Sequence, residues 1–303
     1  MKKLAINLSI LLVILAVTDR ALGGILDIIR DNAPDGRYFK ARYSLNECDE
    51  DIIILGSSRG ESNYAPYLIE DSLGMTCWNA SRGGQGLSYF RCMEEGILNR
   101  YTPKWLILNI EADILDYAPL NEHAGFLRPF YNKHPEIRPI LNEISWSEPL
   151  LMNSRLYAYN SSFYYLMRPY LIEGLDGKSI DKGWKPLLGK LNEATVAPFS
   201  IINTQLPLNE AAVRSFETFI KRIEQTDCQL FMVVSPNYGE QVKTTSTMQY
   251  LKAFSEKHNI PMFDYSADNF LTRHPEYFND VQHLNKEGAI YFTRQLISKL
   301  KQE

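Results

Sequence analysis

The stretch IIILGSSRG, residues 52–60, joins four apolar residues to a glycine, two serines and an arginine. A short apolar run that stops at a glycine is typical of a strand buried on both faces of a parallel sheet. In such a sheet, ligands bind at the carboxyl ends of the strands, near the point where the strand order reverses. The hydroxyls of Ser57 and Ser58 are therefore expected at the edge of the sheet where binding and chemistry occur.

Similar apolar runs recur along the chain and predict five strands, at 51–56, 75–79, 104–110, 228–235 and 260–266. Helical periodicity lies between them, most clearly at 209–225 and from about residue 286 onward. Alternating strands and helices predict an α/β fold, a three-layer α/β/α sandwich. The alternation breaks at about 117–205, a region rich in tyrosine and proline that is expected to form a helical and loop insertion after the third strand. Its aromatic residues either pack in a core or line a substrate cleft.

Composition excludes several classes of protein. The chain has 303 residues, of which 45% are hydrophobic and 22% charged, so it is not disordered. Its net charge of -4 and its scattered lysines and arginines provide no basic surface for a phosphate backbone, so no nucleic acid partner is expected.

The N-terminus has the pattern of an export signal. Lys2 and Lys3 precede the apolar stretch LAINLSILLVILAV. The nearest small-residue site is the sequence ALG at 21–23, which is a poor cleavage site. We therefore expect residues 1–29 to be an uncleaved signal anchor, with an extracytoplasmic domain at 30–303. The alternatives are a cleaved signal peptide, which would leave a secreted or periplasmic protein, and a buried helix of the fold.

The four cysteines share no spacing of the metal-binding type. They are interpreted as buried thiols or, in an oxidising compartment, as a source of one disulfide of unassigned pairing. No H-x-H or H-E-x-x-H motif, P-loop or dinucleotide fingerprint is present either. No metal and no cofactor are expected.

A serine nucleophile needs a general base and a group that orients this base. The stretch FNDVQHLNKEG, residues 278–288, supplies a candidate pair in Asp280 and His283, which are three residues apart just before the last helix. The alternative role for the pair is helix capping and a local hydrogen bond. The other four histidines lie in polar or proline-flanked stretches and are expected at the surface: His123, His134, His258 and His274.

The order of these blocks resembles the SGNH/GDSL hydrolase superfamily, and in particular its exported, polysaccharide-associated members. The resemblance covers the α/β core, from about 51 to 116 and from 227 to 300. It implies a parallel, flavodoxin-like sheet, with Ser58 as nucleophile and Asp280 and His283 as its partners. The stretch NASRGGQG, residues 79–86, resembles the second block. In that block Gly84 is expected to donate its backbone N–H to the oxyanion, together with the N–H of Ser58.

The third block departs from the family pattern. The family places an asparagine donor just after the third strand, but LNIEADIL at 108–115 puts Asn109 inside the predicted strand and acidic residues at 111 and 113. An ionised carboxylate cannot stabilise a developing oxyanion. Catalysis would then depend on the backbone donors or on a residue that the sequence does not identify.

Three residues near these blocks are candidate substrate contacts. Arg59 could bind an anionic substrate group such as a uronic acid or a phosphate, or pair inside the cleft with Glu61, Glu111 or Asp113. Asn79 and Gln85 could contact the substrate, or serve as turn residues.

The resemblance implies an extracytoplasmic serine esterase or O-acyltransferase. Its expected substrate is an acylated glycan of the cell surface or a small ester, and its expected membrane contact is the N-terminal segment. The alternative is a catalytically impaired module of the same fold that binds a glycan or acts as a scaffold. The unmatched third block motivates this alternative.

Overall fold

The structure is a computed structural model. It describes residues 1–116, 121–160, 162–171, 182–192, 206–239, 245–266 and 270–303.

A parallel sheet of five strands forms the centre of the domain. The strands follow the order β2-β1-β3-β4-β5, and each pairs in parallel with its neighbour. This order places β1 inside the sheet. β2 is added on one side of β1 and β3 on the other, so the strand order reverses between β1 and β3. All five predicted strands are confirmed: β1 (Ile52–Leu55), β2 (Cys77–Asn79), β3 (Trp105–Asn109), β4 (Gln229–Val234) and β5 (Met262–Asp264).

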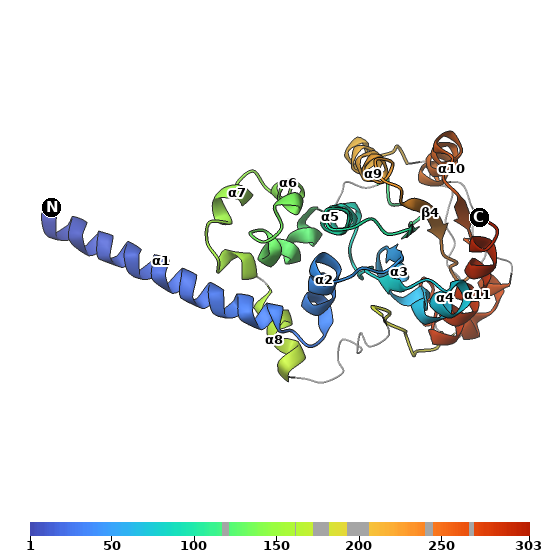
Figure 1. Ribbon diagram of the computed structural model, residues 1–303, viewed down its shortest axis with the longest axis horizontal. Helices are drawn as coiled ribbons and strands as arrows, with labels where there is room; N and C mark the ends of the chain where they lie inside the picture. The colour runs from blue at the N-terminus through green and yellow to red at the C-terminus, as the bar shows by residue number, and fades with distance from the viewer. Residues whose placement is uncertain (117–120, 161, 172–181, 193–205, 240–244, 267–269) are drawn as a thin grey trace.

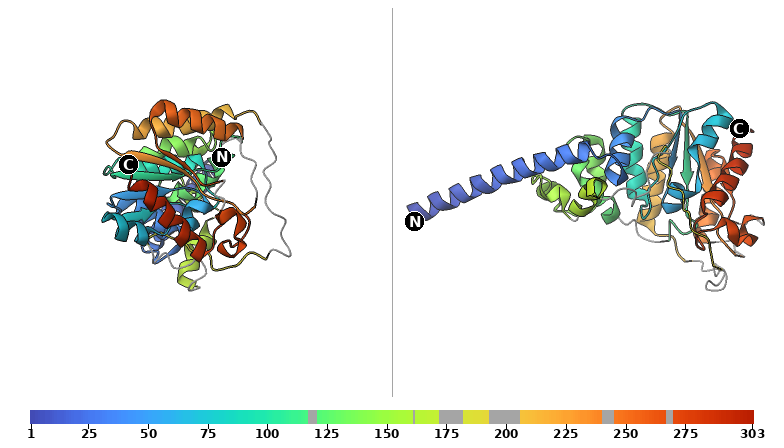
Figure 2. Two further views of the ribbon diagram at one scale, coloured as in Figure 1. Left: turned by 90° about the vertical axis from the view of Figure 1, so that its right-hand side faces the viewer. Right: turned by 90° about the horizontal axis from the view of Figure 1, so that it is seen from below.

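Helices cover both faces of the sheet and complete the predicted three-layer sandwich, as the views in Figure 2 show. Ile53 and Leu55 of β1 face one core and Ile52 and Ile54 the other, because successive side chains of a strand alternate. The first face is covered by α2 (Gly36–Asn46), α5 (Leu87–Leu98), α9 (Glu210–Ile223) and α10 (Ser246–His258). The second is covered by α4 (Pro66–Leu73) and α11 (Lys286–Leu300), with the short α3 (Ser58–Asn63) beside them.

The two helices predicted from periodicity are confirmed and have polar caps. Asn209 precedes α9 and its side chain accepts hydrogen bonds from the N–H groups of Ala211 and Ala212, at 3.0 and 3.1 Å. Asn285 caps α11 in the same way, through the N–H of Gly288 at 3.0 Å. Such caps satisfy amides that have no partner within the helix, which explains why both helices begin where they do.

The described part of the insertion after β3 is made of short helices. They are η1 (Asn121–Phe130), η2 (Pro135–Ile137), α6 (Arg138–Asn142), α7 (Glu148–Leu151), η3 (Tyr157–Tyr159) and α8 (Phe163–Leu171). Two further 3-10 helices, η4 (Leu271–Arg273) and η5 (Pro275–Tyr277), precede α11. Aromatic residues such as Phe130 and Tyr159 are buried, as the packing interpretation predicts, whereas Phe163 and Tyr164 of α8 are more than half exposed.

The N-terminal helix α1 (Lys2–Asp31) projects from the domain as a long rod (Figure 1). It is long and apolar enough to cross a membrane, and only 6% of its apolar window is buried. The alternative of a buried core helix is therefore wrong. Beyond Asp19 the helix packs on the insertion: Asp19 accepts a hydrogen bond from the N–H of Leu156 at 3.1 Å, and the fully buried Arg30 contacts Tyr159. The predicted boundary at residue 29 lies within this helix.

The cysteines Cys48, Cys77, Cys92 and Cys228 are all buried, free thiols. Burial raises the pKa of Cys48 to about 11, which keeps it in the unreactive thiol form.

Candidate active site

The end of β1 brings Ser58 to the carboxyl edge of the sheet. All four residues of β1 are fully buried, so the polar residues begin only where the strand ends. Gly56 allows this end of β1 to approach β3, because a Cβ at position 56 would lie 2.8 Å from the Cβ of Asn109. Ser58 is then the first residue of α3, next to the point where the strand order reverses.

The three predicted catalytic residues form a continuous hydrogen-bonded chain. The Oγ of Ser58 lies 2.7 Å from Nε2 of His283, and Nδ1 of His283 lies 2.8 Å from Oδ1 of Asp280. Asp280 also accepts the N–H of Gln282 at 3.0 Å and the side-chain amide of Asn279 at 3.0 Å. Burial opposes the ionisation of Asp280, but these hydrogen bonds and His283 outweigh it, so the pKa of this carboxyl is lowered.

The loop that carries Asp280 and His283 is held at both ends. Phe278 and Leu284 form an antiparallel bridge, and the Asn285 cap of α11 follows directly. The N–H of Leu284 also donates to the side chain of Asn63, the last residue of α3, at 3.2 Å. Helix α3, which begins at Ser58, and the loop that carries Asp280 and His283 are thus joined to each other as well as to the sheet.

Two backbone N–H groups near Ser58 are available to an oxyanion. Within the described residues, neither the N–H of Ser58 nor that of Gly84 has a hydrogen-bond acceptor. Gly84 has a φ of +71°, in the left-handed region that favours glycine. The neighbouring Gly83 lies closer to the nucleophile, since a Cβ there would be 3.5 Å from the Cβ of Ser58, but its N–H donates to Glu61 at 2.9 Å.

Arg59 is part of a buried ion pair beneath the site. Its guanidinium pairs with Glu111 and donates to the side chain of Asn237, and the residue is only 5% exposed. Glu111 also accepts the hydroxyl of Ser57 at 2.6 Å. Of the two roles expected for Arg59, the structure therefore shows the ion pair with Glu111 inside the site and not a side chain free to bind an anionic substrate. Glu111 therefore places a carboxylate beside Ser57.

Asn109 and Asn79 also have structural roles. The Oδ1 of Asn109 accepts the hydroxyls of Tyr64 and Ser235, at 2.7 and 2.8 Å, so this buried side chain joins β3 to its neighbours. Asn79 is fully buried and donates to the carbonyl of Gly60 at 2.8 Å, which excludes direct contact with a substrate.

Gln85 is half-buried, and its amide donates to the carbonyl of Gly84 at 3.1 Å. A substrate contact of Gln85 stays a prediction.

Residues 182–192, within the predicted insertion, lie against the candidate site. The indole of Trp184 donates to the carbonyl of Ser62 at 2.6 Å, and the N–H of Lys185 donates to that of Glu61 at 3.1 Å. At the far end of this segment, the N–H of Gly189 donates to the side chain of Asn279 at 3.0 Å. The segment therefore contacts both the nucleophile helix and the base loop. The only local signal for it was an isolated glycine-tryptophan pair in a polar stretch.

The remaining described histidine side chains pair with nearby glutamates. His258 and His274 each lie 2.7 Å from a nearby glutamate, and the side chain of His123 lies outside the described residues. The surface prediction for His134 is wrong: it is 6% exposed because it bridges Glu136 and Asn46. Among the described residues, no group of three or more His, Cys, Asp or Glu side chains is arranged to hold a metal ion.

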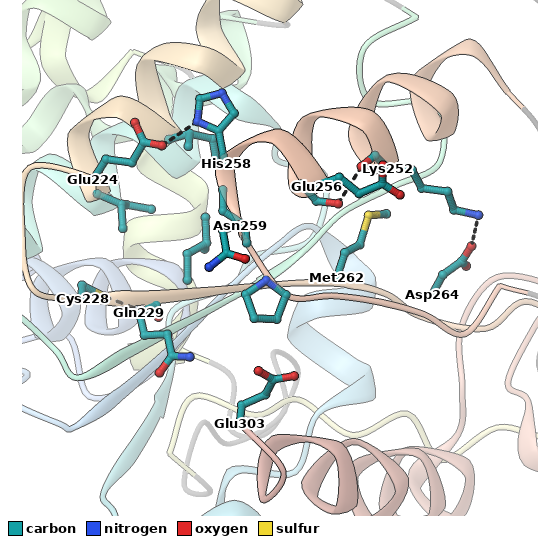
Figure 3. A pocket seen from close by; sticks show the side chains of 16 residues that line it. Glu224, Cys228, Gln229, Lys252, Glu256, His258, Asn259, Met262, Asp264 and Glu303 are labelled. Carbon is teal, nitrogen blue, oxygen red and sulfur yellow. Dashed lines mark hydrogen bonds and ion pairs between the residues drawn. The ribbon is translucent and has the colours of Figure 1, made fainter.

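A cavity of about 690 Å³ lies elsewhere on the domain. Figure 3 shows its lining, which includes the hydrogen-bonded pair Glu224 and His258 and the ion pair Lys252 and Asp264. It reaches the amino ends of β4 and β5, whereas Ser58 follows the carboxyl end of β1. This cavity and Ser58 therefore lie at opposite ends of the parallel strands.

Comparison with known proteins finds likeness in structure only. No family model and no curated protein matches the chain. A putative acylhydrolase from Bacteroides fragilis is 12% identical with a TM-score of 0.38, over 89% of this chain and 93% of that one. A family two carbohydrate esterase from Clostridium thermocellum, solved with cellohexaose, is 8% identical with a TM-score of 0.39, over 84% of this chain and 64% of that one.

This chain therefore spans about two thirds of the length of the carbohydrate esterase. The likenesses are too distant to carry a functional assignment, which depends on side-chain geometry.

Proposed function

We propose that the protein is an extracytoplasmic serine esterase or O-acyltransferase. One observation carries this proposal: Ser58, His283 and Asp280 form an unbroken hydrogen-bonded chain, with 2.7 Å between the hydroxyl and the imidazole and 2.8 Å between the imidazole and the carboxylate. A serine hydroxyl is a weak nucleophile until a positioned base takes its proton. The chain supplies that base, together with the group that orients it.

The reaction follows from the direction of these hydrogen bonds. Nε2 of His283 takes the proton of Ser58 as Oγ forms a bond to the ester carbonyl carbon. The tetrahedral intermediate collapses when the alcohol leaves with the proton that His283 returns, and the acyl group stays on Ser58. Water or a sugar hydroxyl, activated by the same imidazole, then takes the acyl group and frees the serine. Asp280, with its lowered pKa, stays ionised and stabilises the imidazolium.

The oxyanion of the intermediate is assigned to two backbone donors, the N–H groups of Ser58 and Gly84. Neither N–H has another acceptor in the described residues. Preorganised donors of this kind are worth about 10²- to 10³-fold in turnover each. Glu111 serves the site indirectly, by holding Ser57 and Arg59 in place.

The proposed substrate is an acyl ester, carried by a glycan of the cell surface. Helix α1 supports the location, because it is long and apolar enough to span a membrane and has two lysines at its start. The contacts of Asp19 and Arg30 with the insertion favour retention of this helix as an anchor. The choice of a glycan depends on the resemblance to exported members of the SGNH/GDSL superfamily.

Covalent labelling of the full-length protein in detergent tests the proposal. A fluorophosphonate probe should add one mass increment to the wild type by intact mass spectrometry, and none to Ser58→Ala or His283→Ala. The matched control is Ser57→Ala, which removes the adjacent hydroxyl and should still be labelled. A folded wild type that takes no label, or label that persists in Ser58→Ala, would refute the assignment of the nucleophile.

A second candidate function is a binding or scaffold module of the same fold. The observation in its favour is Asn109, because its buried side-chain amide N–H already donates to Glu111 at 3.3 Å rather than to an oxyanion. This candidate predicts an unlabelled but folded wild type that still binds glycans.

A further inference from the structure

The charges of α1 indicate where a membrane crossed by this helix ends. Between Lys3 and Asp19 the helix has no charged residue, and Arg20 follows. Lys3 and Arg20 are 17 residues apart in sequence, which is about 26 Å of helix at 1.5 Å per residue. The hydrocarbon core of a bilayer is about 30 Å thick, and long basic side chains extend from it to the headgroups. The outer boundary of the membrane is therefore expected close to Arg20.

The insertion is attached to α1 at this same level. Asp19 accepts hydrogen bonds from the hydroxyl of Ser154 at 2.5 Å and from the N–H of Leu156 at 3.1 Å. The guanidinium of Arg20 donates to the carbonyl of Asn153 at 2.8 Å. The segment that follows α7 is thus fixed beside Arg20. Figure 1 shows α7 on the side of the domain that faces the N-terminal half of α1.

The surface of α7 and the residues just before it is apolar and exposed. Trp146 is 92% exposed, Leu150 70% and Leu151 38%. The only charged residue of this stretch, SWSEPLLM, is Glu148, which is 1% exposed because it pairs with an arginine of η1. The stretch therefore presents apolar side chains without an exposed charge, as a surface that contacts lipid does.

Helix α8 also carries exposed apolar side chains, but it lies farther from the membrane boundary. The hydroxyl of Tyr170 on α8 donates to the carbonyl of Ile29 at 2.7 Å. Ile29 is nine residues beyond Arg20, which is about 14 Å of helix. The headgroup layer on one side of a bilayer is only about 5–8 Å thick. When α1 crosses near the bilayer normal, α7 lies at the depth of the headgroups and α8 lies outside them.

We infer that Trp146 and α7 insert into the headgroup layer of the membrane that α1 spans. The inference rests on the proposed location of the protein and deepens it. An indole suits this layer because its ring is apolar and its N–H finds polar partners there. Leu150 and Leu151 bury apolar area beside it. Attachment at both α1 and α7 prevents the domain from turning about the axis of α1, so the site around Ser58 keeps one orientation to the membrane surface.

Tryptophan fluorescence of the full-length protein in phosphatidylcholine vesicles tests this contact. The chain has four tryptophans, and the other three lie on β2, β3 and the segment 182–192. The difference between the wild type and Trp146→Phe isolates the emission of Trp146. This emission should be blue-shifted from that of an indole in water. Lipids brominated on the acyl chains should quench most of it, and bromine near the ester end of the chain should quench more than bromine near the methyl end.

A tryptophan at another exposed position provides the matched control. Leu188 is 80% exposed and lies next to the start of α11, since the carbonyl of Leu187 accepts the N–H of Lys286 at 2.7 Å. Figure 1 shows α11 on the side of the domain away from α1. The double variant Trp146→Phe/Leu188→Trp should show water-like emission that brominated lipids do not quench.

Flotation of the same vesicles separates the contact of α7 from the anchor. Both the wild type and Trp146→Phe should float with the lipid, because α1 remains. Protein that does not float would refute the anchor and with it the contact of α7. Protein that floats while Trp146 has water-like, unquenched emission would refute the contact alone. Blue-shifted emission that bromine does not quench would also refute it, in favour of a second copy of the chain on α7. Fluorophosphonate labelling of Ser58 tests the esterase independently of these results.

Discussion

His283 and His258 are each hydrogen-bonded to a carboxylate, but the other groups around the two rings differ. Each places Nδ1 close to a carboxylate oxygen, at 2.8 Å from Asp280 and at 2.7 Å from Glu224. The other nitrogen of His283 meets the hydroxyl of Ser58, whereas the ring of His258 stacks on Phe254 with 4.0 Å between centroids. His258 lines the cavity of about 690 Å³ that Figure 3 shows, and the hydrogen bond of its ring within the described residues is the one to Glu224.

The comparison shows that a hydrogen-bonded pair of histidine and carboxylate is common in this fold. What distinguishes His283 is the serine hydroxyl on its second ring nitrogen. His134 and His274 form further pairs with Glu136 and Glu276, two residues along the chain in each case. Such local pairs follow from sequence proximity and cost the fold little. Contact with a serine 225 residues away requires the sheet, the base loop and α3 to come together.

The largest expected effect is that of replacing His283 with alanine, compared with the same change at His258. His283→Ala should reduce kcat/KM on an activated acetate ester by about 10⁴-fold or more, because the serine loses its base. His258→Ala, the matched control, should change it less than twofold. Steady-state assays of the full-length variants in detergent measure both. Equal losses in the two variants would show that the geometry around Ser58 does not define the active site.

The carboxylate of the catalytic chain has the next largest effect. Asp280→Asn should reduce kcat by about 10³- to 10⁴-fold, because an amide favours the wrong tautomer of His283 and cannot stabilise its charge. Glu224→Gln, the corresponding change beside His258, should leave kcat as it is.

The pH dependence adds a second test of the same residue. Since the pKa of Asp280 is lowered, this carboxyl is ionised throughout the working range, and its ionisation should not contribute to the acid limb of kcat/KM. An acid limb that follows the titration of Asp280 would contradict its ionised role.

Sequence reasoning identified the strands and the hydrogen-bonded chain of Ser58, His283 and Asp280 because both have local signals. Runs of apolar residues mark strands that are buried on both faces, and the order of serine, aspartate and histidine blocks follows the order of the sheet. The partner of Arg59 was reduced to three acids, of which Glu111 is the one observed. The choice among them depends on how closely β1 approaches β3, and this is a property of the tertiary structure alone.

The rest of the site had no such signal. The cavity of about 220 Å³ beside Gly83 combines residues from α2, the turn after β2, α8 and the segment 183–185, which are far apart in sequence. His134 appeared to be a surface residue from its polar and proline-flanked neighbours, yet it is buried because Asn46 of α2 packs against it. Local patterns report which face of an element is apolar, and they carry no information on which distant polar groups meet.

The buried ion pair of Arg59 and Glu111 gives a third comparison, between an arginine under the site and one on the surface. Arg59→Ala should destabilise the protein by about 3 kcal/mol, because the partly buried Glu111 would lose its charged partner and the hydrogen bond to Asn237 would be lost. The melting temperature should fall by about 10 °C. Arg294→Ala, at an exposed position, should change stability by less than about 0.5 kcal/mol. Circular dichroism melts provide the measurement, and a raised KM with an unchanged melting temperature would restore Arg59 to substrate binding.

The smallest expected effect concerns two buried glutamates, Glu61 beside the catalytic site and Glu94 on α5. Burial opposes the ionisation of both. Lys40, the N–H of Gly83 and Lys185 outweigh it at Glu61, whose pKa is lowered. At Glu94 burial dominates and Glu95 adds repulsion, so the pKa is raised well above its ordinary value. Stability from protonated Glu94 is therefore fully present below the unfolded pKa of about 4.3 and is lost as the pH rises towards the folded pKa.

Glu94→Gln removes the ionisable group, so the variant should not lose this stability as the pH rises. The variant and the wild type should have equal stability near pH 4, and the variant should gain on the wild type by up to about 1.4 kcal/mol per pH unit until the folded pKa is passed. Thermal melts of the full-length proteins between pH 4.5 and 8 measure the difference. Glu287→Gln is the control, since this glutamate lies at an exposed position on α11. Parallel curves for the wild type and Glu94→Gln would show that Glu94 ionises freely in the fold, and the contrast with Glu61 would then be lost.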